Sequence, residues 1–144
     1  MPNNDISVLI VDDNDMIRET LRVILRHDHY NVVGEAVDGN VAIEMVRKHK
    51  PDIILLDVEM PKVSGLEAIR TIKMLMPDVT VLIVTANKDQ TTVSEAVKAG
   101  INGYIMKPFN AKKILDTVEA VALKIRASKA TAAKALASGN SGVS

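Results

Sequence analysis

The chain of 144 residues has no cysteine and no tryptophan, and it has only one phenylalanine and two tyrosines. Without cysteine it has no disulfide bond, thiol nucleophile or zinc–thiolate site. Eighteen basic and eighteen acidic residues cancel, so no net charge attracts it to nucleic acid or to an anionic membrane. No apolar run approaches the ~18 residues of a membrane span, and the polar residues 1–7 lack the features of a signal peptide. We therefore expect one soluble, cytoplasmic domain that contacts no membrane and does not bind nucleic acid through this chain.

What the sequence does contain is a regular alternation of two apolar patterns. Short runs rich in Ile and Val, bounded by Asp, Gly, Pro or Asn, are typical of strands that are buried on both faces. These runs are Val8–Val11, Asn31–Val37, Asp52–Leu56, Thr80–Val84 and Gly103–Met106. The segments between them and after the last have helical spacing, and their apolar positions lie within residues 17–25, 42–46, 66–73, 93–97 and 114–125.

The ends of the expected helices carry recognisable signals. Ser64 and Glu67 have the spacing of a capping box. Gly100 is placed to end the fourth helix as its first residue beyond the cap, and the fifth helix should begin near Asn110. Five strands alternating with five helices predict a (βα)5 fold of the α/β class, a doubly wound five-stranded parallel sheet with helices on both faces.

The composition changes after about residue 126, where Ala, Lys and Ser replace large apolar residues and Gly and Ser follow. Because Ala and Lys favour helix, the fifth helix can continue past the core. We therefore divide the chain into a domain at residues 1–126 and a C-terminal extension at residues 127–144, which ends in a flexible tail. A frayed terminus, the start of a linker and a docking segment all remain open for the extension.

Polar side chains follow four of the expected strands at their carboxyl ends, where open α/β sheets bind their ligands. Asp12 and Asp13 follow the first strand, Asp57 the third, Thr85 the fourth and Lys107 the fifth. Taken singly, each has an ordinary explanation, such as a helix cap, a packing residue or a solvated charge. Their gathering at one edge of the sheet points instead to a site.

Three neighbouring carboxylates repel one another unless a cation lies between them. Mg²⁺ prefers oxygen ligands and keeps several waters, and such an ion favours phosphoryl transfer by neutralising charge on the phosphoryl oxygens. A carboxylate can itself be the nucleophile and form an aspartyl phosphate. Lys107 would add a positive charge beside the phosphoryl group, and Thr85 would add a hydroxyl donor.

The segments VLIVDDN, DIILLDVEMPKVSG, VLIVTA and GYIMKPF resemble the motifs of receiver domains in bacterial two-component response regulators, of the CheY-like, single-domain type. The resemblance covers Ser7 to Ile125 in order and spacing. It implies the flavodoxin-like strand order 2-1-3-4-5, which periodicity alone does not reveal. It also implies a function in phosphorelay signal transduction, without turnover of an external substrate.

The resemblance assigns a role to each site residue. Asp57 is implied to be the phosphoacceptor, and Lys107 and Thr85 assist it. The implied Mg²⁺ ligands, which would also suit Mn²⁺, are Asp13, Asp57 and the backbone carbonyl of Glu59, with Asp12 acting through a water. Thr85 and Tyr104 match the switch pair, and the bond between Lys107 and Pro108 is expected to be cis.

Some positions depart from the most frequent residues of the family. Glu59 and Asn87 occupy positions that tune the lifetime of the phosphate. Ser64 replaces a frequent Asp. Asn102 and Gly103 replace an acidic pair found in members that dimerise through charged contacts, which weakens the expectation of that dimer.

The expected partners are a sensor histidine kinase or a histidine phosphotransfer protein, and a downstream protein that binds the face formed by the fourth helix, the fifth strand and the fifth helix. One alternative is the receiver part of a longer, DNA-binding regulator. A remote alternative is an aspartyl-phosphate phosphatase, which would need a second Asp where this chain has Glu59. A flavin-binding protein is disfavoured, because the acidic loop after the first strand would repel phosphate.

Overall fold

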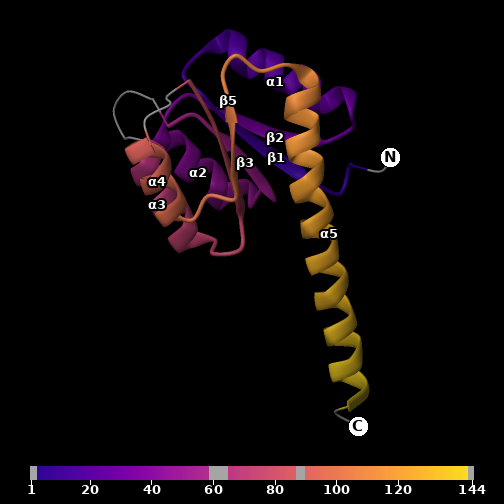
Figure 1. Cartoon of the computed structure of the whole chain (residues 1–144). Coiled ribbons are helices and arrows are strands. Elements are labelled where there is room, and N and C mark those ends of the chain that lie inside the picture. The colour runs from indigo at the N-terminus through magenta and orange to yellow at the C-terminus, as the bar shows by residue number, and fades with distance from the viewer. Residues whose placement is uncertain (1–2, 59–64, 87–89, 143–144) are drawn as a thin grey trace.

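The computed structural model describes residues 3–58, 65–86 and 90–142 and shows a five-stranded parallel sheet between two layers of helices (Figure 1). The strands are β1 (Ser7–Val11), β2 (Asn31–Ala36), β3 (Ile53–Leu56), β4 (Thr80–Thr85) and β5 (Gly103–Met106). The helices are α1 (Asp15–His27), α2 (Gly39–His49), α3 (Gly65–Leu75), α4 (Gln90–Ala99) and α5 (Ala111–Gly142). The strand order is β2-β1-β3-β4-β5, so the predicted (βα)5 fold and its order are confirmed.

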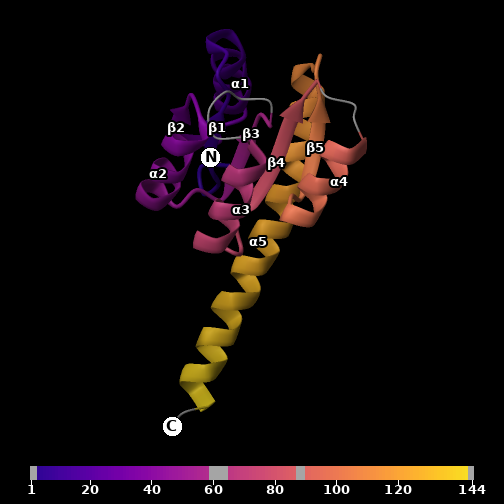
Figure 2. The same ribbon diagram turned by 90° about the vertical axis from the view of Figure 1, so that its left-hand side faces the viewer.

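Two apolar cores lie on the two faces of the sheet. Alternate residues of each central strand point to opposite faces, as Leu9 and Ile10 of β1 do. The first core is covered by α2, α3 and α4, and the second by α1 and α5, an arrangement that is visible in Figure 2. Because β1, β3 and β4 are covered on both sides, they consist almost entirely of apolar residues.

The two outer strands differ from the expectation of complete burial. Most residues of β2 are only partly buried, and Tyr104 of β5 is 52% exposed. Both strands form edges of the sheet, where one side has no neighbouring strand. The boundaries shift by one residue at four places: β1 begins at Ser7, β2 ends before Val37, β3 begins after Asp52 and β4 includes Thr85.

Local side chains and backbone geometry define the helix ends. Asn14, Asp38 and Asn110 accept hydrogen bonds from backbone N–H groups three residues on, in the first turns of α1, α2 and α5. At the end of α4, Gly100 has a φ of 104°, and its N–H donates to the carbonyl of Val97 while the next N–H donates to that of Ala96. These bonds form a Schellman motif, as predicted for Gly100. The predicted cap Ser64 lies outside the described residues.

Helix α5 continues well past the sheet and forms an arm at the lower end of the molecule (Figures 1 and 2). It includes residues up to Gly142, so it takes in part of the segment that we expected to be a flexible tail. None of the helices in the described ranges is both long enough and apolar enough to cross a membrane.

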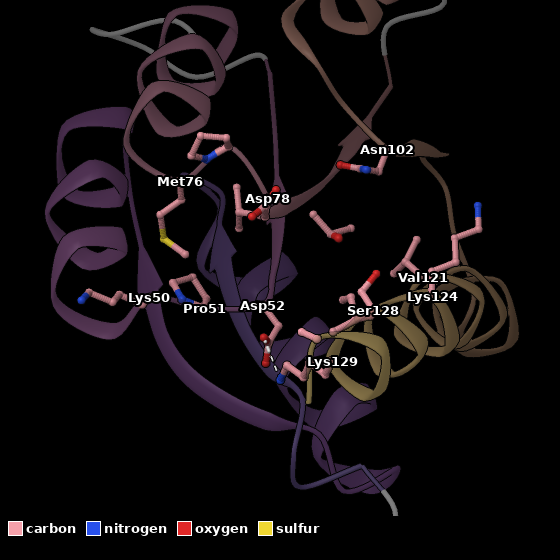
Figure 3. A pocket seen from close by; sticks show the side chains of 15 residues that line it. Lys50, Pro51, Asp52, Met76, Asp78, Asn102, Val121, Lys124, Ser128 and Lys129 are labelled. Carbon is pink, nitrogen blue, oxygen red and sulfur yellow. Dashed lines mark ion pairs between the residues drawn. The ribbon is translucent and has the colours of Figure 1, made fainter. Parts of the chain in front are cut away.

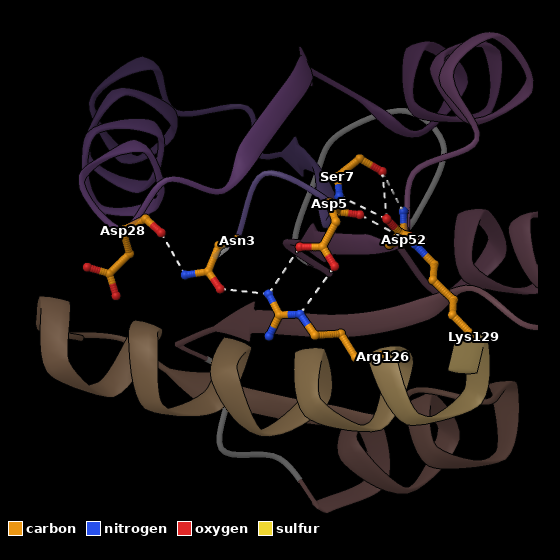
Figure 4. A network of polar contacts seen from close by, with 7 residues as sticks. All are labelled: Asn3, Asp5, Ser7, Asp28, Asp52, Arg126 and Lys129. Atoms are coloured by element: carbon orange, nitrogen blue, oxygen red, sulfur yellow. Dashed lines mark hydrogen bonds and ion pairs between the residues drawn. The ribbon is translucent and has the colours of Figure 1, made fainter. Parts of the chain in front are cut away.

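A polar network attaches the start of the arm to the rest of the domain (Figure 4). Arg126 donates to Asp5 at 3.2 Å and 3.3 Å and to the Asn3 side chain at 2.7 Å. Lys129 pairs with Asp52 at 3.1 Å, and Asp52 accepts from the backbone N–H and the hydroxyl of Ser7. These contacts join α5 to segments that precede β1 and β3.

Candidate functional site

The register of the sheet brings the acidic residues together. Val11 pairs with Leu56 across β1 and β3, so Asp12 and Asp57 leave neighbouring strands at the same level. The N–H of Asp57 donates to the carbonyl of Val11 at 2.9 Å, which fixes the two strand ends together. Residues far apart in sequence thus meet at the carboxyl edge of the sheet.

The carboxylates of Asp12, Asp13 and Asp57 form a cluster in which one oxygen of each lies within 4.8 Å of the others. Asp12 and Asp57 are buried, at 1% and 4% exposure, whereas Asp13 is exposed. Buried carboxylates are costly unless charges and hydrogen bonds compensate them. The cluster therefore needs positive charge on its buried side and can receive more from solvent through Asp13.

Lys107 supplies the buried positive charge. Its Nζ lies 3.2 Å from Asp12 Oδ2 and 3.4 Å from Asp57 Oδ2. Burial alone would lower the pKa of Lys107, but the attraction of Asp57 and Asp12 outweighs it and raises this pKa. The Lys107–Pro108 bond is cis, and the Lys107 N–H donates to the Thr85 carbonyl at 2.8 Å. The raised pKa keeps the Lys107 ammonium protonated between the carboxylates of Asp12 and Asp57.

The first loop holds the acidic pair through residues that sequence reasoning did not identify. The N-cap of α1 is Asn14 rather than Asp12 or Asp13. The backbone N–H of Asn14 donates to Asp12 Oδ1 at 2.9 Å. Arg18 Nη1 donates to the backbone carbonyl of Asp12 at 2.6 Å, and Arg18 also pairs with Glu35 of β2. Besides Asp15 in its own helix, Arg18 thus contacts another strand and the loop before α1, and no local pattern reveals these two contacts.

Gly65 is a second residue that the sequence did not single out. A Cβ at this position would lie 2.4 Å from the Val58 Cα and 2.9 Å from the Asp57 carbonyl oxygen. Such distances leave no room for any side chain, so α3 begins in direct backbone contact with the residues at the end of β3. The glycine thereby sets how closely α3 approaches Asp57.

The remaining predicted residues are placed as follows. Thr85 ends β4 and is 1% exposed, next to the strand that carries Asp57. Tyr104 lies on β5 with its ring turned toward solvent. Glu59 and Asn87 lie outside the described residues. Asn102 has a structural role, because its Oδ1 accepts from the Val81 N–H at 2.9 Å.

The donor set suits a hard divalent cation. Three carboxylates converge without any histidine in the cluster, in the part of the chain that the structure describes. Mg²⁺ is commonly bound through one or two carboxylates and keeps several waters, and the exposed position of Asp13 leaves the cluster open to solvent on one side. The site can therefore combine a metal with a buried carboxylate that already contacts an ammonium.

These features define a class: a doubly wound α/β domain with an acidic cluster and a paired lysine at its topological switch point, where ligands bind in such sheets. The family model of the response regulator receiver domain matches residues 8–119. The chain belongs to this family. Receiver domains act in phosphorelay signalling, bind Mg²⁺ in an acidic pocket and are signalling proteins rather than classical enzymes.

Relatives include both short and long proteins. The chain is 38% identical over 120 residues to the transcriptional regulatory protein DegU of Brevibacillus brevis, with 83% of this chain covered, and it spans only 51% of that relative's length. It is 37% identical over 114 residues to the chemotaxis protein CheY of Thermotoga maritima, covering 79% of this chain and 95% of CheY. Among solved structures, the receiver domain of NarL from Mycobacterium tuberculosis has a TM-score of 0.77 and 30% identity, with 81% and 95% of the two chains covered.

Proposed function

We propose that Asp57 is the phosphoacceptor of this receiver domain and that the phosphoryl group comes from a phosphohistidine of a histidine kinase or phosphotransfer protein. The observation that carries the proposal is that the Asp57 carboxylate belongs to the carboxylate cluster and also has an oxygen 3.4 Å from Lys107 Nζ. An Asp57 oxygen attacks phosphorus, the P–N bond breaks, and the electron pair stays with the histidine nitrogen. The product is an aspartyl phosphate.

The neighbouring residues divide the remaining work. Asp13 and Asp57 would hold Mg²⁺ together with the Glu59 backbone carbonyl, and Mn²⁺ would suit the same oxygen ligands. When bound, the ion neutralises charge on the phosphoryl oxygens. Both oxygens of Asp12 already accept hydrogen bonds, from Asn14 and Lys107, which supports a role through a water. Lys107 can shift from Asp57 to a phosphoryl oxygen.

A switch would follow from the added charge. A phosphoryl group brings about −1.5 to −2 charges and new acceptor oxygens, and the hydroxyl of Thr85, which ends β4, would donate to one of them. Movement of Thr85 would open space for the ring of Tyr104, which faces outward in this structure. Phosphorylation would then increase the population of molecules in which the Tyr104 ring points inward. This change would alter the face formed by α4, β5 and α5, which a downstream protein would bind.

The test is phosphorylation with a small phosphodonor. Intact-mass analysis after incubation with acetyl phosphate and Mg²⁺ should show one added phosphoryl group, which EDTA prevents. Asp57→Asn should abolish the modification. Asp13→Asn keeps the Asp57 acceptor, so this variant should still be phosphorylated but should need a higher Mg²⁺ concentration. Phosphorylation that persists in Asp57→Asn at the same rate would refute the assignment.

The lifetime of the phosphate forms a separate part of the proposal. Glu59 and Asn87 stand two residues after Asp57 and Thr85, where they would flank the approach of water. We expect Glu59→Asn and Asn87→Glu to change the rate of autodephosphorylation, which is measured as the loss of the added phosphoryl mass over time. Unchanged rates in both variants would exclude this role.

A second candidate function is that of the receiver part of a longer, DNA-binding regulator. The 51% coverage of the Brevibacillus relative favours it, and the uninterrupted α5 would suit a helical connection to another domain. Immunoblotting of the native host with an antibody against this domain distinguishes the two, because a longer regulator gives a band well above the 15.6 kDa of this chain.

A further inference from the structure

A groove lies at the edge of the sheet opposite the carboxylate cluster (Figure 3). It has a volume of about 710 Å³, within the range of roughly 300–1,000 Å³ that is common for binding pockets. Its walls come from residues just before β3, β4 and β5 and from the start of the α5 arm. The floor is apolar and includes Met76, Val79, Val121 and Ile125.

The arm presents a regular stripe of residues to this groove. Val121, Ile125, Ser128 and Ala132 line it, at intervals of four, three and four residues. Such intervals keep the side chains on one helix face and suit packing against a second helix. Ser128 and Ala132 are small, so a second helix can approach the arm closely, and the apolar floor can receive its larger side chains.

The charges around the groove are unbalanced. Three lysines and two aspartates line it, and Asp52 is paired with Lys129 at 3.1 Å. Lys50 and Lys124, which also line the groove, have no ion pair within the described part of the chain. After Glu119 the sequence has four basic residues and no acidic one. The groove and arm therefore offer unpaired positive charge around an apolar floor.

We propose that this groove binds an acidic amphipathic helix of another protein, which lies along the arm with its apolar side chains on Met76 and Val121. A second copy of the arm fits poorly, because both arms are basic and would repel each other. The groove faces away from Asp57, so it forms an interaction surface separate from the phosphoacceptor site. It would let the domain hold a partner independently of phosphorylation.

Fluorescence anisotropy with designed peptides tests the proposal on the full chain. One labelled peptide has three heptads with Leu at a and d and Glu at the outer positions, and the other has Lys in place of Glu. We expect the acidic peptide to bind at least about tenfold more tightly than the basic one, with an affinity that falls as salt rises. Equal binding, or none by the acidic peptide, would overturn the proposal.

Matched variants locate the binding site. Ala132→Glu places a negative charge in the groove and should weaken binding of the acidic peptide about tenfold. Ala130→Glu makes the same change at an exposed position of the same helix outside the groove and should have little effect. Lys124→Glu should also weaken binding. Equal effects of Ala130→Glu and Ala132→Glu would refute the groove as the site.

Two further measurements separate this proposal from its competitors. Asp57→Asn should bind the acidic peptide as the wild type does, even if the phosphoacceptor assignment fails. Light scattering should show a monomer at the concentrations used. A dimer that Ala132→Glu dissociates would make a second copy the occupant and overturn the proposal.

Discussion

Replacing Gly65 by Ala tests how closely α3 must approach the end of β3, which carries Asp57. The new methyl carbon would lie 2.4 Å from the Val58 Cα, 2.9 Å from the Asp57 carbonyl oxygen and 3.1 Å from the Val58 carbonyl carbon. An ordinary contact begins at about 3.5 Å, so the backbone must separate by about 1 Å. Overpacking of this kind typically costs ~1–3 kcal/mol. The clash is with backbone at 2.4 Å, so we take the upper end of that range. The better helix propensity of Ala offsets at most ~1 kcal/mol, which leaves a net loss of about 2 kcal/mol.

Gly34→Ala is the matched control. A Cβ at Gly34 would lie 3.0 Å from the Met45 sulfur and 3.5 Å from Leu9 Cδ1. The flexible Met45 side chain can move away, and replacing a glycine restricts the unfolded chain. We therefore expect Gly34→Ala to stay within ~1 kcal/mol of the wild type.

Urea denaturation, monitored by circular dichroism, measures the free energy of unfolding of both variants. The slope of this free energy against urea concentration should equal that of the wild type, as expected for two-state unfolding. Gly65→Ala should also slow phosphorylation by acetyl phosphate, because the clash displaces the backbone that carries Asp57. The reasoning is refuted if Gly65→Ala is as stable as the wild type, or if Gly34→Ala loses as much stability as Gly65→Ala.

Three further predictions concern polar contacts. Lys107→Met should lower the free energy of unfolding at pH 7 by roughly 3 kcal/mol, because it removes the ammonium that both buried carboxylates contact. The folded pKa of Lys107 is raised above 10.5, so its stabilisation is present below pH 10.5 and is lost as the pH rises through the folded pKa. Urea titrations of the two proteins should therefore converge at high pH. Asn102→Ala should cost about 1–2 kcal/mol by removing the acceptor for the Val81 N–H, whereas Asn102→Asp, which keeps an acceptor oxygen, should lose less in thermal denaturation. Arg126→Met should speed hydrogen exchange in the segment before β1, which Arg126 contacts, and Lys112→Met, which breaks an exposed ion pair within α5, should leave that segment unchanged.

The sequence alone was sufficient where the physics is local. Strands covered on both faces must be apolar, so the sequence indicates β1, β3 and β4, and the polar residues directly after them mark the edge of the sheet where the carboxylate cluster lies. The Schellman end at Gly100 could also be predicted, because it depends on one residue and its neighbours. The strand order came from a family resemblance, since periodicity carries no information on which strands pair.

Only the tertiary structure decided which distant groups meet. The register between β1 and β3 sets Asp12 beside Asp57. The path of β5 brings Lys107 to both of these residues, and α1 brings Arg18 to the backbone of Asp12. The requirement for Gly65 arises from a backbone approach between α3 and the end of β3, and the groove arises because α5 overhangs the opposite edge of the sheet. Such features depend on distances between segments that are remote in sequence, and local propensity and spacing do not determine those distances.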